Sequence, residues 1–232
     1  MKLAVMQPYF LPYIGYFQLM AEVDKFVIFD DVNFINRGWI NRNRILVNGK
    51  TFMMTIPIKN VSQNNKINEI EIVPGVLWRA KLLRTIEQSY KRAPYYEEVI
   101  PLVVSILDVH CSHLSTFVTQ SIVCIKEWLG IECELVESSS IYANTRLKGE
   151  ERILDICRKE NATQYINLPG GRDLYVRDSF ASQCIDLYFI KPLLLEYSQN
   201  TKEFIPWLSI IDLIMFNGKQ VTTDMLMAVE LQ

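Results

Sequence analysis

The first 31 residues decide the fold, and they read MKLAVMQPYFLPYIGYFQLMAEVDKFVIFDD. Residues 2–6 form a short apolar run, which is typical of a strand that is buried on both faces of a parallel sheet. Residues 13–23 carry apolar side chains at helical spacing, and residues 25–29 form a second apolar run that ends at two aspartates. Strand, loop, helix and strand in this order predict a βαβ unit.

The rest of the chain predicts an α/β protein with a β-hairpin and a helical insertion. Asn48-Gly49 between two apolar runs is typical of a tight hairpin, and residues 67–73 are interpreted as another strand. A helix over residues 208–216 is expected to end at Asn217-Gly218, with a last helix over 219–231. We expect one α/β domain over residues 1–232 with a Rossmann-like core, made of an N-terminal α/β part (1–73), a helical insert (74–130) and a C-terminal α/β part (131–232).

Composition excludes several classes of protein. Hydrophobic residues make up 50% of the chain and charged residues 22%, which excludes a disordered protein. The 24 basic and 26 acidic residues give a net charge of −2, so we expect no nucleic-acid partner. Five cysteines without a C-x-x-C pair predict reduced thiols, and no ligand set predicts a metal site. We recognise no signal peptide and no run of ~20 apolar residues that would span a membrane, so we expect a cytoplasmic protein.

The loop after the first strand is the first candidate site, because ligands of open α/β sheets bind beyond the carboxyl ends of the strands. Two prolines fix its backbone, and a glycine in the first helical turn lets another group come close. Glutamine and tyrosine polar groups are costly to place in a core, although a rigid loop that only packs is the alternative. The residues expected to bind substrate here are Gln7, Tyr9, Tyr13, Gly15 and Tyr16.

Two aspartates and an arginine-rich loop follow the second strand. Asp30 and Asp31 end that strand at the same edge of the sheet, where one of them orients an amine or acts as a base; a turn or helix cap is the alternative. Arg37, Trp39 and Arg42 are typical of a mobile arm that binds phosphate and a flat ring, with a solvated loop as the alternative.

Further candidates lie in the second half of the chain. His113 is a candidate general base, because only histidine titrates near neutral pH, whereas Cys111 is better explained as a structural helix residue. Asp212 lies in an apolar helix, where a buried carboxylate needs a partner. Glycines after a strand can hold phosphate, and a plain turn explains them equally well; the residues concerned are Asn167, Gly170 and Gly171.

The layout of the N-terminus resembles that of the nucleotidylyltransferases, in which a His-x-Gly-His sequence opens the first helix. Tyr13-Ile14-Gly15-Tyr16 occupies that place here. Tyrosine is neutral at pH 7 and does not replace a cationic imidazole, so the resemblance concerns the geometry of the loop and not the adenylyl-transfer chemistry.

The sequence as a whole resembles the WbqC-like protein family over nearly its entire length. The resemblance rests on residues 7–16 (QPYFLPYIGY), 24–27 (DKFV), 30–32 (DDV), 37–43 (RGWINRN), 165–167 (YIN) with Gly170-Gly171, and 209–212 (SIID) with Phe216-Asn217. It implies a bacterial protein of O-antigen or other surface-polysaccharide biosynthesis that transfers an acyl or aminoacyl group, such as glycine, to an amino sugar.

Read against that resemblance, the candidate residues predict a transferase whose substrate is a nucleotide-linked amino sugar. The expected acyl donor is a thioester of a carrier protein or of coenzyme A (CoA), and no tightly bound cofactor is expected. Two alternatives remain open. One is a nucleotidyltransferase-like enzyme that needs magnesium and releases pyrophosphate, and the other is a non-catalytic protein that binds a sugar nucleotide.

Overall fold

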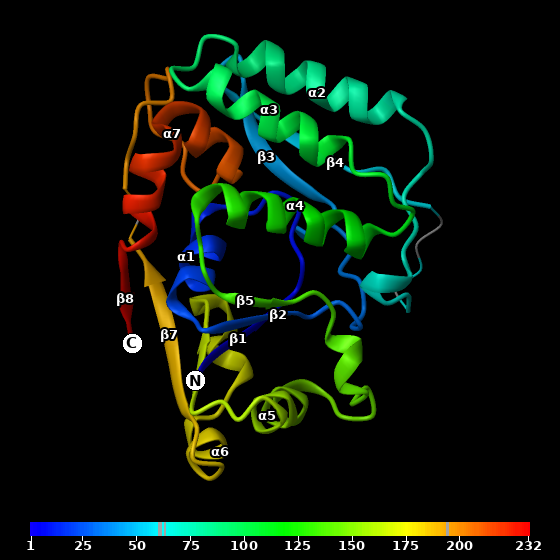
Figure 1. The fold of residues 1–232 in the computed structure, drawn as a ribbon, viewed down its shortest axis with the longest axis vertical. Helices are drawn as coiled ribbons and strands as arrows, with labels where there is room; N and C mark the ends of the chain where they lie inside the picture. Colours follow the sequence, from blue (N-terminus) through cyan, green and yellow to red (C-terminus); the bar gives the residue numbers. More distant parts are fainter. Residues whose placement is uncertain (60–61, 63, 194) are drawn as a thin grey trace.

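The structure is a computed structural model that describes residues 1–59, 62, 64–193 and 195–232 (Figure 1). Its centre is a six-stranded sheet in the order β5-β2-β1-β6-β7-β8, in which β8 alone runs antiparallel to its neighbour. The strands of this sheet are β1 (Lys2–Met6), β2 (Lys25–Ile28), β5 (Glu134–Val136), β6 (Gln164–Asn167), β7 (Asp186–Pro192) and β8 (Val229–Leu231). A separate antiparallel hairpin consists of β3 (Arg42–Val47) and β4 (Lys50–Thr55).

Most of the predicted strands and helices are present, in the predicted order along the chain. The βαβ unit at the N-terminus is present, with β1 and β2 paired in parallel and Leu3 opposite Lys25. The expected hairpin and helical insertion both lie between β2 and β5. The helices are α1 (Ile14–Glu22), α2 (Leu77–Tyr90), α3 (Tyr96–Leu107), α4 (Leu114–Leu129), α5 (Gly149–Lys159), α6 (Arg177–Ala181) and α7 (Ile210–Leu226). The mostly parallel sheet and its strand order are compatible with a Rossmann-like fold.

The sheet is covered on both faces, which explains why its strands are short and apolar. Alternate residues point to opposite sides: Ala4 and Phe26 belong to a core shared with α1, α3, α4 and α7, whereas Leu3 and Val27 belong to a smaller core under α5 and α6. Figure 1 shows α2, α3 and α4 grouped beyond one side of the sheet and α5 and α6 beyond the other. Both layers leave the carboxyl ends of the strands accessible to the connecting loops.

Two sequence-based assignments of elements were wrong. Residues 67–73 form a 3₁₀ turn (Ile67–Glu69) followed by isolated bridges from Glu71 to His113 and from Ile72 to Ile58, and no continuous strand pairs with them among the described residues. The last helix ends at Leu226, because the residues after it form β8 and pair with the end of β7. The expected break at Asn217-Gly218 is confirmed, since Gly218 has a φ of 67° inside α7.

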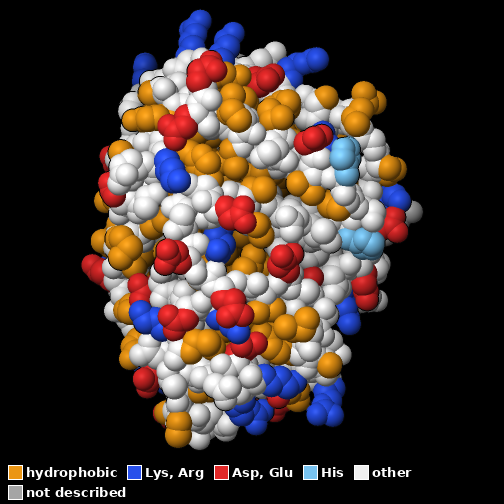
Figure 2. Space-filling view, viewed as in Figure 1, with side chains coloured by type: hydrophobic (Ala, Val, Ile, Leu, Met, Phe, Trp, Pro, Cys, Tyr) orange, Lys and Arg blue, Asp and Glu red, His pale blue; other side chains and the backbone are white. Residues whose placement is uncertain are grey.

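Figure 2 shows several Lys and Arg side chains at the two ends of the long axis, while acidic, basic and apolar side chains are mixed across the middle of the same face. In the part of the chain that the structure describes, no helix is both long enough and apolar enough to cross a bilayer. The described residues also contain no group of three or more potential metal ligands from His, Cys, Asp and Glu.

Candidate functional site

The candidate site is a pocket at the carboxyl ends of β1, β6 and β7. The connections of the sheet change direction between β1 and β6, and ligands of open α/β sheets bind outside such a switch point. The pocket has a volume of about 320 Å³, which is at the lower end of the range for small-molecule sites. It is lined by Tyr9, Pro12, Tyr13, Trp39, Asn43, Arg44, Pro169, Gly170, Pro192 and Trp207.

The β1–α1 loop is held in place by two other parts of the chain. The side-chain amide of Asn43 donates hydrogen bonds to the carbonyl oxygens of Phe10 (3.1 Å) and Leu11 (2.7 Å). The hydroxyl of Ser209, at the start of α7, donates to the carbonyl of Leu11 at 2.8 Å. Leu11 itself has a φ of 44°, a backbone conformation that is unfavourable for a branched residue and that these bonds maintain. The loop is therefore fixed before any ligand arrives.

Aromatic rings form two walls of the pocket. Tyr13 packs edge-on against Trp207, with ring centroids 5.6 Å apart and an interplanar angle of 83°. Trp39 is 40% exposed at the pocket, and the guanidinium carbon of Arg44 lies 5.4 Å from the centre of its ring. Flat, partly exposed indoles of this kind suit a planar base or the apolar face of a sugar ring.

Arg44 is the permanently charged residue among those that line the pocket. One of its terminal nitrogens, Nη2, donates to the carbonyl of Trp207 at 3.4 Å. Its Nε is buried and has no hydrogen-bond partner among the described residues. No aspartate, glutamate or histidine lines the pocket in the described part of the chain. Because no described carboxylate in the lining neutralises the charge of Arg44, the pocket favours an anionic group.

The tyrosines of the pocket are neutral hydrogen-bond donors at physiological pH. Burial raises the pKa of the Tyr9 hydroxyl, and burial together with the nearby Tyr9 raises the pKa of Tyr13 to about 12. Tyr13 also precedes α1, whose first turn has no side-chain cap and no acidic residue. The N-terminal end of that helix favours negative charge, as does Arg44.

Three residues near this loop that were predicted to bind substrate, Gln7, Gly15 and Tyr16, do not line the pocket. Tyr16 is fully buried against Phe17 and Phe26, and its hydroxyl donates to the carbonyl of Gln7 at 3.1 Å. A Cβ on Gly15 would lie 2.3 Å from Cε2 of Tyr13, so the group that this glycine admits is the Tyr13 ring of its own chain. A role of Gly15 in substrate binding stays a prediction. Gln7 is half-buried beside the loop and does not line the pocket.

Gly170, in the loop after β6, lines the pocket, whereas its neighbours Asn167 and Gly171 do not. Nδ2 of Asn167 donates to the hydroxyls of Tyr165 (3.1 Å) and Tyr175 (3.3 Å), while its Oδ1 accepts from the backbone N–H of Leu168 at 2.7 Å. A Cβ on Gly171 would lie 3.1 Å from Nδ2 of Asn167. Asn167 and Gly171 therefore shape the turn that presents Gly170.

The two arginines of the predicted arm, Arg37 and Arg42, lie beside the turn that carries Trp39. Arg37 is exposed with a φ of 62°, and Arg42 donates to the backbone carbonyls of Gly38 (2.9 Å) and Arg37, which braces the turn that carries Trp39. Neither arginine lines the pocket. The arginine that lines the pocket is Arg44 in β3, which was not among the predicted site residues.

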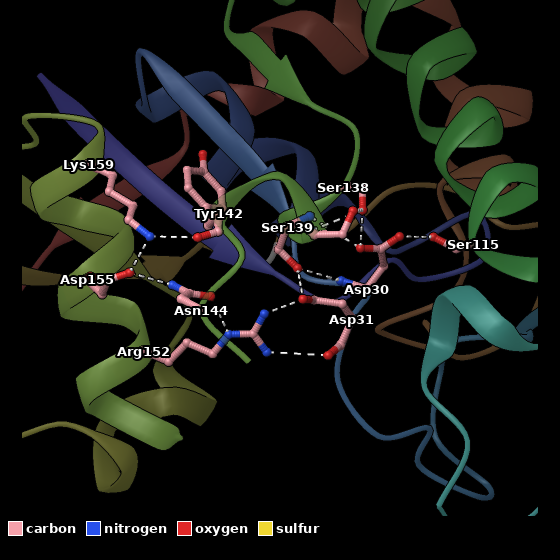
Figure 3. A network of polar contacts seen from close by, with 11 residues as sticks. Asp30, Asp31, Ser115, Ser138, Ser139, Tyr142, Asn144, Arg152, Asp155 and Lys159 are labelled. Carbon is pink, nitrogen blue, oxygen red and sulfur yellow. Dashed lines mark hydrogen bonds and ion pairs between the residues drawn. The ribbon is translucent and has the colours of Figure 1, made fainter. Parts of the chain in front are cut away.

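Asp30 and Asp31 lie in a separate buried network at the ends of β2 and β5 (Figure 3). Asp30 accepts hydrogen bonds from the hydroxyls of Ser115 (2.7 Å) and Ser138 (2.7 Å). Asp31 accepts from the hydroxyl of Ser139 and forms an ion pair with Arg152 at 2.5 Å. The two carboxylates are 3% and 4% exposed and tie α4 and α5 to the sheet. Neither carboxylate lines the pocket, and a catalytic role of Asp30 or Asp31 stays a prediction.

The network extends along α5 beyond the ion pair. Nε of Arg152 donates to Oδ1 of Asn144 at 2.8 Å, and Nδ2 of Asn144 donates to Asp155 at 2.8 Å. Lys159 completes the chain of contacts with Asp155 (2.9 Å) and with the carbonyl of Tyr142 (2.6 Å) (Figure 3). The arrangement is that of a structural brace between layers.

His113 lies outside the pocket as well. Its side chain is exposed, its Nδ1 is 3.1 Å from the hydroxyl of Ser112, and its backbone pairs with Glu71 at the start of α4. Its assignment as general base stays a prediction. Cys111 lines a different hollow of about 380 Å³, and burial raises the pKa of its thiol despite the nearby Arg79.

Comparisons with known proteins define the class of this chain. Residues 7–224 match the model of the WbqC-like protein family, and the chain belongs to that family. It is similar to "Uncharacterized protein Rv1507c" of Mycobacterium tuberculosis (strain ATCC 25618 / H37Rv), with 29% identity over 223 residues, which cover 94% of this chain and 95% of the relative. No solved structure significantly matches this chain.

Proposed function

We propose that the protein is a transferase that attaches an acyl or aminoacyl group to the amino group of a nucleotide-linked sugar, in the assembly of O-antigen or another surface polysaccharide. The pocket at the carboxyl ends of β1, β6 and β7 is its sugar-nucleotide site. The observation that carries the proposal is Arg44, the cation among the described lining residues, in a pocket that no described carboxylate lines and that is walled by Trp39 and Trp207. An anionic diphosphate and a planar or apolar ring are the two chemical features that this pairing suits.

The proposed reaction is the attack of an amine on a thioester. The sugar nitrogen forms a bond to the carbonyl carbon, the C–S bond breaks, and the proton of the amine leaves with the sulfur as a free thiol. Tyr9 and Tyr13 keep their protons, so their hydroxyls can donate to the oxygen that becomes negative as the nitrogen attacks. The thioester is that of a carrier protein or of coenzyme A, and the protein needs no bound cofactor for this step.

The first test is a binding measurement. Isothermal titration calorimetry with UDP- and dTDP-linked amino hexoses is expected to detect binding to the wild type. Arg44→Met is expected to weaken it by about tenfold or more, because a charge-assisted hydrogen bond contributes about 1.5–3 kcal/mol. Arg84→Met removes an exposed arginine of α2 outside the pocket and serves as the matched control. Failure of every sugar nucleotide to bind contradicts the proposal.

The second test is the transfer itself. Incubation of the protein with a sugar nucleotide that binds and with acyl thioesters should release free thiol and add the acyl mass to the sugar. A non-catalytic sugar-nucleotide-binding protein is the second candidate, and it is favoured by one observation: no carboxylate or imidazole lines the pocket in the described residues. Binding of the sugar nucleotide without release of thiol from any thioester would decide for that candidate.

A further inference from the structure

A second hollow, on a different part of the protein, lies between the end of α2 and the tip of the β3–β4 hairpin. It has a volume of about 450 Å³, within the range of small-molecule sites. The segment before α7 and Phe216 of α7 complete its lining. The hairpin tip lies against that segment, since a Cβ on Gly49 would be 3.9 Å from Cγ2 of Thr201. Among the described residues, none lines both this hollow and the candidate pocket.

The hollow carries positive charge that no acidic residue of its lining offsets. Lys91 and Arg92 directly follow α2 and both line the hollow, whereas no aspartate or glutamate lines it in the described part of the chain. The carboxyl end of a helix carries about half a negative charge, which two full side-chain charges outweigh. The hollow is therefore positive overall and favours an anionic ligand.

Amide groups and an aromatic ring lie around these two cations. Asn48, Gln88 and Asn200 are exposed and line the hollow, so each offers hydrogen-bond donors and an acceptor to a ligand. Phe216 is half-buried and packs edge-on against Tyr90, with ring centroids 6.0 Å apart and an interplanar angle of 70°. Amides suit the hydroxyl groups of a sugar, and an aromatic ring suits its apolar face.

The floor of the hollow is held by hydrogen bonds within the protein. The hydroxyl of Tyr90 accepts from the N–H of Leu46 at 3.3 Å and donates to Asp212 at 2.7 Å. The amide of Gln199 donates to Asp212 (3.1 Å) and to the carbonyl of Ile205 (3.0 Å), and it accepts from the N–H of Ile205 at 2.8 Å. Because these bonds exist without a ligand, binding does not have to pay for ordering the floor.

We propose that this hollow is a second binding site, and that its ligand is a small phosphorylated sugar. Lys91 and Arg92 bind the phosphate, the exposed amides bind the hydroxyl groups, and Phe216 contacts the apolar face of the ring. A phosphate ion alone would leave the amides and most of the 450 Å³ unused. The inference does not rest on the proposed function, because the two sites share none of the described residues.

Ligand-observed NMR on the full protein tests this site with glucose 1-phosphate and glucose 6-phosphate, whose phosphates lie at opposite ends of the sugar. We expect at least one of them to bind with a Kd on the order of 1 mM or below. It should bind at least about fivefold more tightly than glucose, or than inorganic phosphate measured as a competitor, because only the sugar phosphate engages both the cations and the amides. Binding of neither sugar phosphate overturns the inference, as does equally tight binding of inorganic phosphate or of glucose.

Variants locate the binding. The double variant Lys91→Met, Arg92→Met is expected to weaken it by about tenfold, since two exposed charged contacts of a few-fold each are lost. Both side chains are exposed, so the variant is expected to fold like the wild type. Lys81→Met, Arg84→Met removes one lysine and one arginine from the exposed surface of α2 outside the hollow, and this matched control should bind like the wild type. Unchanged affinity in the first variant, or an equal loss in the control, overturns the inference.

Discussion

Removal of the Asp212 carboxylate is the perturbation whose effect can be worked out in most detail. Asp212 is fully buried and accepts hydrogen bonds from Tyr90, Tyr197 and Gln199, which come from α2 and from the segment before α7. Asp212→Ala leaves these donors without an acceptor. Tyr90 is 1% exposed, so its hydroxyl would stay buried without an acceptor, at a cost of about 1–3 kcal/mol. Tyr197 and Gln199 would recover part of their lost hydrogen bonding by moving toward solvent.

We therefore expect Asp212→Ala to lower the free energy of unfolding by about 2–5 kcal/mol, and Asp212→Asn by less, because an amide keeps one acceptor. Urea denaturation followed by tryptophan fluorescence measures both values. The same variants should weaken sugar-nucleotide binding, since the segment that Asp212 anchors carries Trp207 into the pocket. A loss of less than about 1 kcal/mol for Asp212→Ala would refute the assigned role of the network.

The pH dependence of this effect has a definite sign. Burial raises the pKa of Asp212 above its ordinary value of 3.8, despite hydrogen bonds from Tyr90, Tyr197 and Gln199 that lower it. The folded state then binds the proton more tightly than the unfolded state. Protonation of Asp212 therefore stabilises the wild type fully below pH 3.8, and this contribution is lost as the pH rises through the raised pKa. The stability of the wild type relative to Asp212→Asn should rise as the pH falls through that window, and a constant difference contradicts the reasoning.

Three further predictions concern the buried network of α5, the first turn of α1 and the smaller core. Arg152→Met should lower the free energy of unfolding by about 3–5 kcal/mol in urea denaturation, because it leaves Asp31 buried without its ion pair; a change within experimental error argues against the brace. Gly15→Ala should leave stability within about 1 kcal/mol of the wild type but weaken sugar-nucleotide binding, since the new Cβ displaces the Tyr13 ring; unchanged affinity in calorimetry argues against this. Cys157, whose pKa burial raises to about 12, should resist iodoacetamide at pH 8 until urea is added, as mass spectrometry would report.

The sequence predicts those parts of the fold that depend on local pattern. The apolar runs of the βαβ unit, the Asn48-Gly49 hairpin and the break at Gly218 are each set by neighbouring residues, and all three are confirmed. The strand β8 depends on pairing with Ile190–Pro192, some 40 residues earlier in the chain, so helical periodicity extended the last helix too far. The 3₁₀ turn at Ile67–Glu69 was missed because alternation cannot show that a partner strand is absent.

The residues of the candidate site also fall into those that a local sequence pattern predicts and those that only the tertiary structure brings to the pocket. Of the residues predicted to bind substrate, Tyr9, Tyr13, Trp39 and Gly170 line the pocket, because loops at the carboxyl ends of parallel strands meet at one edge of the sheet. Trp207 follows Pro206 in an irregular segment far along the chain and reaches the pocket through the contacts of Ser209 and Asp212, which no local pattern reveals. A φ of 60° at Trp207, like that of Leu11, is visible only in the structure.

The most direct measurement of the central claim is a crystal structure of the protein with a bound UDP- or dTDP-linked amino sugar. We expect a planar ring of the ligand against Trp39 or Trp207, with diphosphate oxygens within hydrogen-bond distance of the Arg44 guanidinium. A sugar nucleotide bound elsewhere on the protein, or one in this pocket with its phosphates turned away from Arg44, would contradict it.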